Sequence, residues 1–175
     1  MGRFNAILRR IFAIGAGLSM SLVFAIIFVN SVRRYTVGRS VEWGEELPIY
    51  LTIYGVMFGA ALAYSQDRHI RFTILTDFLS DHRRRQLFTV VDAVMVIVGL
   101  TLAYSGHVFA LRRGSVDSSG MVNVARSFAE STGLETLIWI GHVGTYQYAM
   151  AIGGLMLAIA AGAKFFERLG TLKEA

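Results

Sequence analysis

The chain has 175 residues, of which 54% are hydrophobic and 17% are charged, and its formal net charge is +5. The charged fraction lies below the roughly 25% of an ordinary soluble domain, so the composition indicates a protein whose outer surface is solvated by lipid. The sequence contains no cysteine, which excludes disulfides, thiolate nucleophiles and cysteine-based metal sites. The basic residues flank apolar runs, and this pattern indicates membrane topology rather than nucleic-acid binding.

Four apolar segments are each long enough to cross a bilayer as a helix, which takes roughly 20 residues. The predicted spans cover about 11–32, 47–66, 87–111 and 136–163. The first is longer than the roughly 7–15 apolar residues of a signal peptide, so we expect it to be retained. Strict alternation of apolar and polar residues is absent, which argues against barrel strands. The sequence therefore predicts an all-α integral membrane protein with one membrane domain over residues 1–175.

Lysine and arginine are distributed unequally between the two sides of such a protein. Eleven belong to the N-terminal tail, the second loop and the C-terminal tail, and six belong to the first and third loops. The positive-inside rule then places both termini and the second loop in the cytoplasm. Trp43 and Trp139 fall at the opposite interface, where an aromatic belt is expected.

Basic residues at the predicted cytoplasmic face are expected to contact anionic lipid headgroups. These membrane-interface candidates are Arg68, His69, Arg71, Arg83, Arg84 and Arg85. Trp139 is the corresponding candidate at the opposite face. Membrane topology accounts for all of them without any catalytic role.

Small residues recur at four-residue spacing in every predicted span, which keeps each set on one face of its helix. Such faces allow close approach of helix backbones in a bilayer. The sets are Ala13, Gly17, Ser21 and Ala25; Gly55, Gly59 and Ala63; Gly99 and Ala103; and Gly154, Ala158 and Gly162. They predict close packing within the bundle or against a partner protein, and the sequence leaves both possibilities open.

Two segments outside the spans have amphipathic patterns. Residues 72–87 suit a short helix that lies in the cytoplasmic interface. Residues 115–136 mix apolar and polar side chains, and they predict a short helix that rests on the membrane or contacts something above it.

An acidic and aromatic group precedes the second span. Pro48 suits a first helical turn, and carboxylates beside a helix N-terminus complement its dipole. A second interpretation is that Trp43, Glu45 and Glu46 contact a basic group of a partner subunit. Under that interpretation, charge reversal at Glu45 or Glu46 weakens co-purification with the partner.

Three ionisable residues in the spans are candidates for chemistry. Asp92 lies five residues into the third span, where a charge is costly, and a helix–helix hydrogen bond or snorkelling explains it without an ion pathway. His107 and His142 fall at similar depths on two spans, as a bis-histidine haem needs, but a lone histidine pair is more often an interfacial polar contact. No phosphate loop, GxSxG or HExxH motif is present, so we predict no enzyme activity, cofactor or metal.

An ordered set of residues resembles a known membrane family. The set comprises Arg33-Arg34-Tyr35, Trp43-x-Glu45-Glu46-x-x-x-Tyr50, Phe58-Gly59-Ala60-Ala61 and His69-Ile70. Together with the four spans and the length, it resembles the small membrane (Q) subunit of tripartite ATP-independent periplasmic (TRAP) transporters. Tyr54 departs from this pattern, because many relatives have tryptophan there.

The resemblance implies a sodium-driven importer of organic acids, such as sialic acid or a C4-dicarboxylate, in the bacterial inner membrane. A periplasmic binding protein would deliver the substrate to a large membrane subunit, and this chain would brace that subunit without binding substrate or sodium. The candidate contacts with the large subunit are Trp43, Glu45, Glu46, Tyr50, Gly55 and Gly59. Two alternatives are a haem-binding electron-transfer subunit that uses His107 and His142, and a self-assembling channel or holin-like protein.

Overall fold

The computed structural model describes residues 2–67 and 79–173. In these ranges the chain forms four long helices, one short helix and two short 3-10 segments. In chain order they are α1 (Gly2–Val37), η1 (Glu42–Gly44), α2 (Leu47–Ser65), α4 (Asp81–Arg112), α5 (Val122–Thr132), η2 (Glu135–Gly141) and α6 (Val143–Lys173). The described residues contain no strand, and their only β-type pairing is an isolated bridge between Asp117 and His142.

The predicted all-α membrane fold is confirmed. The long helices α1, α2, α4 and α6 are each long and apolar enough to cross a bilayer. Their outer surfaces expose large apolar side chains, among them Phe24 (72% exposed) and Ile97 (64% exposed). Exposed apolar side chains of this kind are favourable in the hydrocarbon of a bilayer, which solvates them, and unfavourable in water.

Several predicted boundaries were wrong at the helix ends. Helix α4 begins at Asp81, so residues 81–87 of the predicted interfacial helix 72–87 are its first turns. Residues 72–78 of that predicted helix lie outside the described residues. Residues 136–141 lie in the 3-10 segment η2, and α6 begins only at Val143. Helix α4 extends beyond its apolar run because backbone hydrogen bonding does not stop where hydropathy changes, whereas α6 starts later than its apolar run because η2 occupies the first residues of that run.

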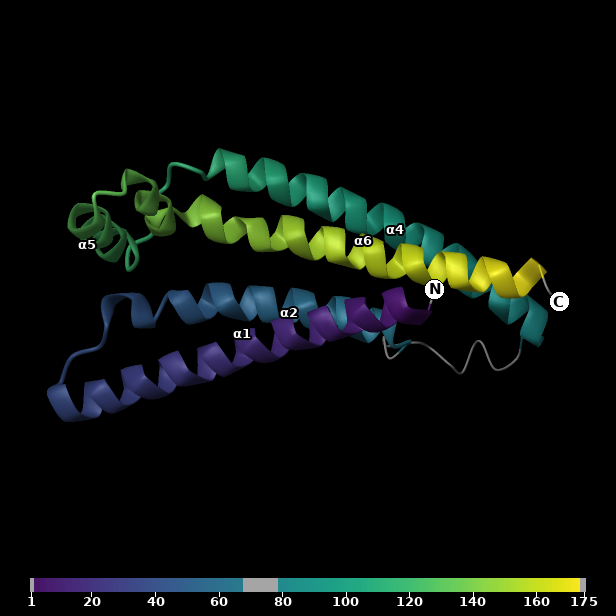
Figure 1. Cartoon of the computed structure of the whole chain (residues 1–175), viewed down its shortest axis with the longest axis horizontal. Helices are drawn as coiled ribbons and strands as arrows, with labels where there is room; N and C mark the ends of the chain where they lie inside the picture. Colours follow the sequence, from purple (N-terminus) through teal and green to yellow (C-terminus); the bar gives the residue numbers. More distant parts are fainter. Residues whose placement is uncertain (1, 68–78, 174–175) are drawn as a thin grey trace.

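The four long helices form two antiparallel hairpins, α1 with α2 and α4 with α6 (Figure 1). Helix α2 also packs on α6, so this pair joins the two hairpins. Both termini lie toward the same end of the bundle, as an even number of crossings requires. The hydrophobic core cluster contains Phe12, Ala61, Tyr64 and Met156.

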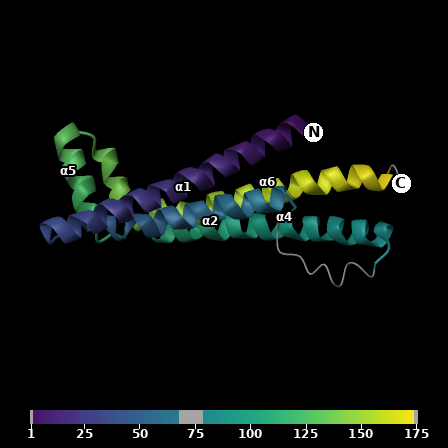
Figure 2. The same cartoon turned by 90° about the horizontal axis from the view of Figure 1, so that it is seen from below.

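The predicted short helix between the third and fourth spans is confirmed as α5. Its buried side is formed by Ala125 and Ala129, which are one turn apart, whereas Phe128 is exposed. The helix ends at Gly133, whose φ of 70° is the left-handed conformation that glycine adopts without strain. Figure 2 shows α5 lying crosswise to the bundle at the end opposite the termini.

The small residues of α4 and α6 pack against each other, which is one of the two possibilities that the sequence left open. A Cβ added to Gly99 would lie 2.6 Å from the backbone nitrogen of Ala158. A Cβ added to Gly154 would collide with the backbone of Ala103. By contrast, the α1 set is exposed, and a Cβ on Gly17 would meet nothing within 4 Å. The small-residue faces of α4 and α6 therefore pack together within the bundle, whereas the small-residue face of α1 stays exposed.

This difference predicts opposite effects of one added methyl group. Replacing Gly99 with alanine is expected to lower the free energy of unfolding by about 1–3 kcal/mol, because the methyl forces α4 away from α6. The matched control Gly17→Ala is expected to raise it by about 0.5–1 kcal/mol, because alanine favours a helix more than glycine and the added methyl meets nothing within 4 Å. Unfolding of the detergent-solubilised variants measures both values, and equal stabilities would contradict the packing.

Candidate functional site

Glu46 ties the start of α2 to the segment between α4 and α5. Its carboxylate accepts hydrogen bonds from the Tyr50 hydroxyl (2.9 Å), the Ser118 hydroxyl (2.6 Å) and the backbone N–H of Gly120 (2.8 Å). Three donors on one carboxylate favour its ionised form. We call Glu46, Tyr50, Ser118 and Gly120 the Glu46 cluster.

Two close approaches hold the Glu46 cluster in place. A Cβ on Gly120 would lie 2.5 Å from the carbonyl oxygen of Glu42, so only glycine lets this segment approach η1. The ring of Tyr50 stacks on Tyr146 of α6, with centroids 4.2 Å apart and planes inclined by 8°. The cluster therefore connects α2, α6 and the segment before α5.

A second polar cluster surrounds Asp92, which is 1% exposed. One carboxylate oxygen accepts a hydrogen bond from the Tyr64 hydroxyl at 2.6 Å, and the other accepts one from the Arg168 guanidinium at 2.7 Å. Arg168 also donates to the backbone carbonyl of Phe88 at 3.2 Å. The predicted helix–helix hydrogen bond of Asp92 is thus confirmed, and it joins α4 to both α2 and α6.

Asp67 extends this network at the end of α2. Its carboxylate binds Arg168 through one oxygen and Lys164 through the other, the latter at 2.6 Å. Lys164 and Arg168 are one turn apart on α6, so they present two cations on the same face of the helix. We call Tyr64, Asp67, Asp92, Lys164 and Arg168 the Asp92 network.

The Asp92 network contains partners that sequence reasoning missed. Lys164 and Arg168 were counted only as basic residues of the C-terminal tail, whereas both lie within α6. Their spacing of four residues just beyond an apolar run is the signal that could have found them. Their pairing with Asp67 and Asp92 depends on the rotation of α6, which the sequence alone does not give.

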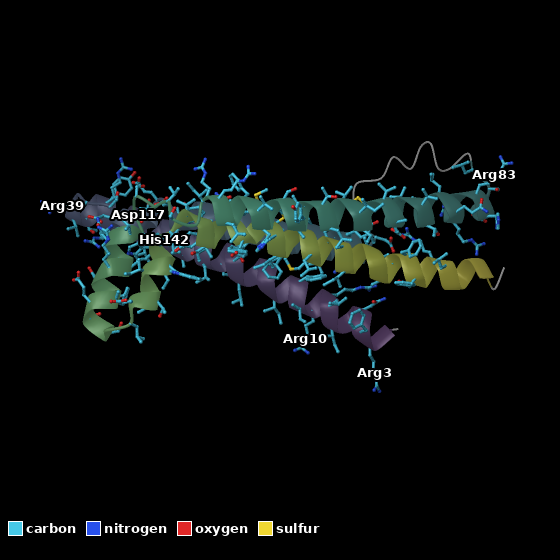
Figure 3. The ribbon with its side chains drawn as sticks, turned by 90° about the horizontal axis from the view of Figure 1, so that it is seen from above. Arg3, Arg10, Arg39, Arg83, Asp117 and His142 are labelled. Atoms are coloured by element: carbon cyan, nitrogen blue, oxygen red, sulfur yellow. The ribbon has the colours of Figure 1, made fainter. Side chains whose placement is uncertain are left out.

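Polar side chains thus gather at both ends of the bundle. Figure 3 places Arg83 toward the end near the termini, and Arg39, Asp117 and His142 at the other end. Asp117 binds Arg126 at 3.1 Å, and its other oxygen lies 3.6 Å from the His142 ring.

The two histidines predicted as haem-ligand candidates have different neighbours. His142 lies beside Asp117, whereas the His107 ring packs against Tyr148 with centroids 5.8 Å apart. Across the part of the chain that the structure describes, no group of three or more histidine, aspartate or glutamate side chains could hold a metal ion.

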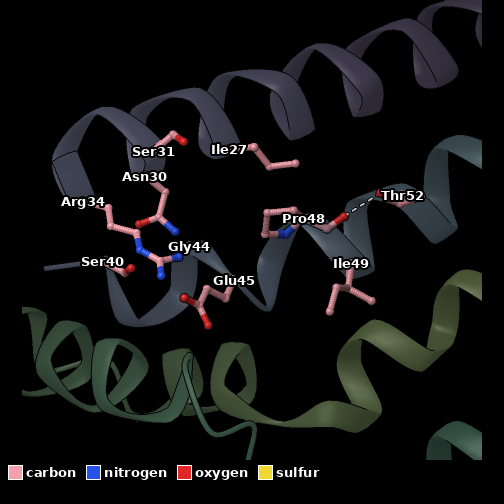
Figure 4. A pocket seen from close by; sticks show the side chains of 10 residues that line it. All are labelled: Ile27, Asn30, Ser31, Arg34, Ser40, Gly44, Glu45, Pro48, Ile49 and Thr52. Carbon is pink, nitrogen blue, oxygen red and sulfur yellow. Dashed lines mark hydrogen bonds between the residues drawn. The ribbon is translucent and has the colours of Figure 1, made fainter.

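A cleft of about 440 Å³ separates the second half of α1 from the start of α2 (Figure 4). It combines apolar side chains with polar and charged ones. The lining residues are Ile27, Asn30, Ser31, Arg34, Ser40, Gly44, Glu45, Pro48, Ile49 and Thr52.

The comparison with known families matches most of the chain. Residues 23–171 match the family described as "Tripartite ATP-independent periplasmic transporters, DctQ component". This chain belongs to the DctQ-component family. The matched range begins within α1 and ends within α6, so it contains α2, α4, α5 and both polar clusters. The family is a transporter component rather than a known enzyme family.

Two curated relatives of this DctQ-family chain come from Haemophilus influenzae. One is 30% identical over 78 residues, which are 45% of this chain and 48% of the relative. The other is 24% identical over 87 residues, which are 50% of this chain and 53% of the relative. Their names describe both provisionally as TRAP transporter small permease proteins, and the matches span about half the length of each relative.

The predicted partner contacts of this DctQ-family chain fall into two groups. Glu46 and Tyr50 belong to the Glu46 cluster, and a Cβ on Gly55 would collide with the Met20 side chain of α1. These three residues therefore support the chain's own fold. Glu45 is exposed, Trp43 is half-buried, and a Cβ on Gly59 would meet nothing within 4 Å.

The predicted membrane-interface residues are described only in part. Arg83, Arg84 and Arg85 are exposed on the first turns of α4, and Trp139 in η2 is 72% exposed. Arg68, His69 and Arg71 lie outside the described residues.

Proposed function

We propose that this chain is the small permease subunit of a sodium-driven TRAP importer of organic acids, of the sialic acid or C4-dicarboxylate type. In this role it braces a large transport subunit, to which a periplasmic binding protein delivers the substrate. The family match over residues 23–171 carries the proposal. The same proposal places the chain in the inner membrane with both termini in the cytoplasm, which the excess of basic residues on that side supports.

The two polar clusters support a bracing role. The Glu46 cluster holds one end of α2 and the Asp92 network holds the other, so α2 is fixed at both ends to the α4–α6 hairpin. Alternating access moves one part of a transporter against another around the binding site. A subunit whose helices are joined at both ends is suited to be the rigid part, against which the mobile part of the transporter moves.

The pairing of buried charges also supports a role other than substrate binding. Within the described residues, the buried acid Asp92 binds Arg168, and the buried base Lys164 binds Asp67. These pairs neutralise one another within the bundle. We therefore assign the binding of the organic acid and of sodium to the large subunit.

We place the contact with the large subunit on the open small-residue surfaces of α1 and α2. Gly17 and Gly59 each have open space in the direction of a Cβ, so another helix backbone can approach them closely. Ala13, Ser21 and Ala25 extend the exposed small surface of α1.

Replacing Gly17 or Gly59 with leucine is expected to lower recovery of the co-expressed large subunit by at least about tenfold, because the new side chain separates the two backbones. Affinity purification of the complex measures this recovery. The control Ala60→Leu adds a similar side chain at the adjacent, exposed position of α2. Wild-type recovery in both glycine variants would place the contact elsewhere.

A transport assay tests the function itself. Vesicles whose membrane contains the large subunit and this chain are expected to take up an organic acid when the binding protein and sodium are supplied outside. Omitting this chain is expected to abolish uptake. Sodium-independent uptake, or full uptake without this chain, would contradict the proposal.

A further inference from the structure

We propose that the cleft between α1 and α2 binds one zwitterionic phospholipid whose headgroup carries a phosphate and a primary amine. Phosphatidylethanolamine has this chemistry. The inference rests on the cleft itself and does not depend on the proposed transport function.

The cleft is charged at one end and apolar at the other, as a phospholipid is. Arg34 lies seven residues beyond Ile27 on α1, which is about 10 Å along the helix axis toward the end of the bundle. On the other wall, Glu45 precedes α2, and Ile49 lies deeper along that helix. The charged side chains therefore lie at the level where α1 ends and α2 begins, and the isoleucines lie closer to the membrane centre.

The charges of Arg34 and Glu45 complement both groups of such a headgroup. Both side chains are exposed, and within residues 2–67 and 79–173 neither makes a hydrogen bond or ion pair. A guanidinium binds phosphate oxygens through two parallel N–H donors, and a carboxylate accepts hydrogen bonds from an ammonium group. By contrast, the neighbouring carboxylate of Glu46 is occupied by three donors of its own chain.

The end of the cleft is preformed by the connection between α1 and α2. The backbone N–H of Val41 donates to the Asn30 side-chain oxygen at 2.7 Å. A Cβ on Gly44 would lie 2.8 Å from the Asn30 side chain, so η1 is held against α1. Figure 4 shows Arg34 reaching from α1 toward this segment, with Glu45 beyond it. Binding a lipid headgroup here needs little rearrangement of the backbone.

The deeper part of the cleft is open to hydrocarbon. Ile27 is 52% exposed and Ile49 is 59% exposed, so both isoleucines offer apolar surface beside the charged end. An acyl chain attached to a headgroup at Arg34 and Glu45 would pass over these side chains. The combination of two opposite charges and an adjoining apolar wall favours a lipid over a free phosphate.

The test measures lipid retained by the full chain after reconstitution in bilayers of equal phosphatidylethanolamine and phosphatidylglycerol. Native mass spectrometry counts bound lipid and identifies its headgroup. The wild-type chain is expected to retain phosphatidylethanolamine preferentially. Arg34→Gln is expected to reduce retention of both lipids by about tenfold, and Glu45→Gln is expected to remove the preference for phosphatidylethanolamine. The control Arg33→Gln alters the adjacent arginine, which does not line the cleft, and is expected to retain lipid like the wild type.

Three results would overturn the proposal. Equal retention of both lipids by the wild type would exclude headgroup recognition. Equal losses in Arg34→Gln and Arg33→Gln would show a general effect of surface charge. Loss of the large subunit from the Arg34→Gln complex, with no lipid retained by the wild-type complex, would show that the partner protein occupies the cleft. Thermal unfolding of each variant distinguishes loss of binding from loss of fold.

Discussion

Replacing Asp92 with asparagine is expected to lower the free energy of unfolding by about 3–5 kcal/mol, the cost of breaking a buried ion pair. Asp92 is 1% exposed and its carboxylate lies 2.7 Å from the Arg168 guanidinium. Without the negative charge of Asp92, the Arg168 guanidinium, whose side chain is only 15% exposed, keeps Asp67 but loses its buried anionic partner. Unfolding of the purified protein in detergent, monitored by circular dichroism, measures the loss.

Two comparison variants test whether the charge pair is responsible. Tyr64→Phe removes one neutral donor to Asp92 and is expected to cost only about 1 kcal/mol. The double variant Asp92→Leu/Arg168→Met removes both charges, so its loss is expected to be smaller than the sum of the two single losses. Additive losses, or wild-type stability of Asp92→Asn, would contradict the role assigned to this pair.

Replacing Glu46 with lysine is expected to lower the free energy of unfolding by more than about 3 kcal/mol, because three donors lose a charged acceptor and face a cation. The Ser118 hydroxyl and the Gly120 N–H are the donors from the segment before α5. We expect faster hydrogen exchange in this segment, and mass spectrometry of its peptides measures that change.

The neighbouring residue provides the control. Glu45→Lys reverses a charge that is exposed and has no partner among the described residues, so it is expected to change stability by less than about 0.5 kcal/mol. Equal effects of the two reversals would show that the Glu46 cluster does not hold α2. The contrast also bears on partner binding: a loss of co-purification in Glu46→Lys would follow from damage to this chain, and would not identify Glu46 as a contact.

The sequence by itself determined the class of fold and the number of spans. Both follow from local properties, since an apolar run of sufficient length must satisfy its backbone hydrogen bonds as a helix in hydrocarbon. The spacing of Gly99 with Ala103, and of Gly154 with Ala158, also predicted close helix packing. The structure confirms it, because each pair lies on one face of its own helix.

Helix ends were predicted less well than helix centres. The segment 72–87 was assigned to a separate interfacial helix, yet residues 81–87 continue directly into α4. An amphipathic turn beside an apolar run has the same local pattern whether it lies along the membrane or extends a spanning helix. Only the three-dimensional structure distinguishes a turn that lies along the membrane from a turn that extends a spanning helix.

Only the tertiary structure decided which charges meet and which small faces are buried. Asp92 and Arg168 are 76 residues apart, and Glu46 and Ser118 are 72 apart, so both contacts depend on the order and rotation of the helices. The orientation of each helix about its own axis also decides whether its small residues are buried. Those of α1 face outward, whereas those of α4 and α6 face each other. Hydropathy fixes how many helices enter the membrane but leaves their rotation to packing, because hydrocarbon solvates every apolar face of a helix equally well.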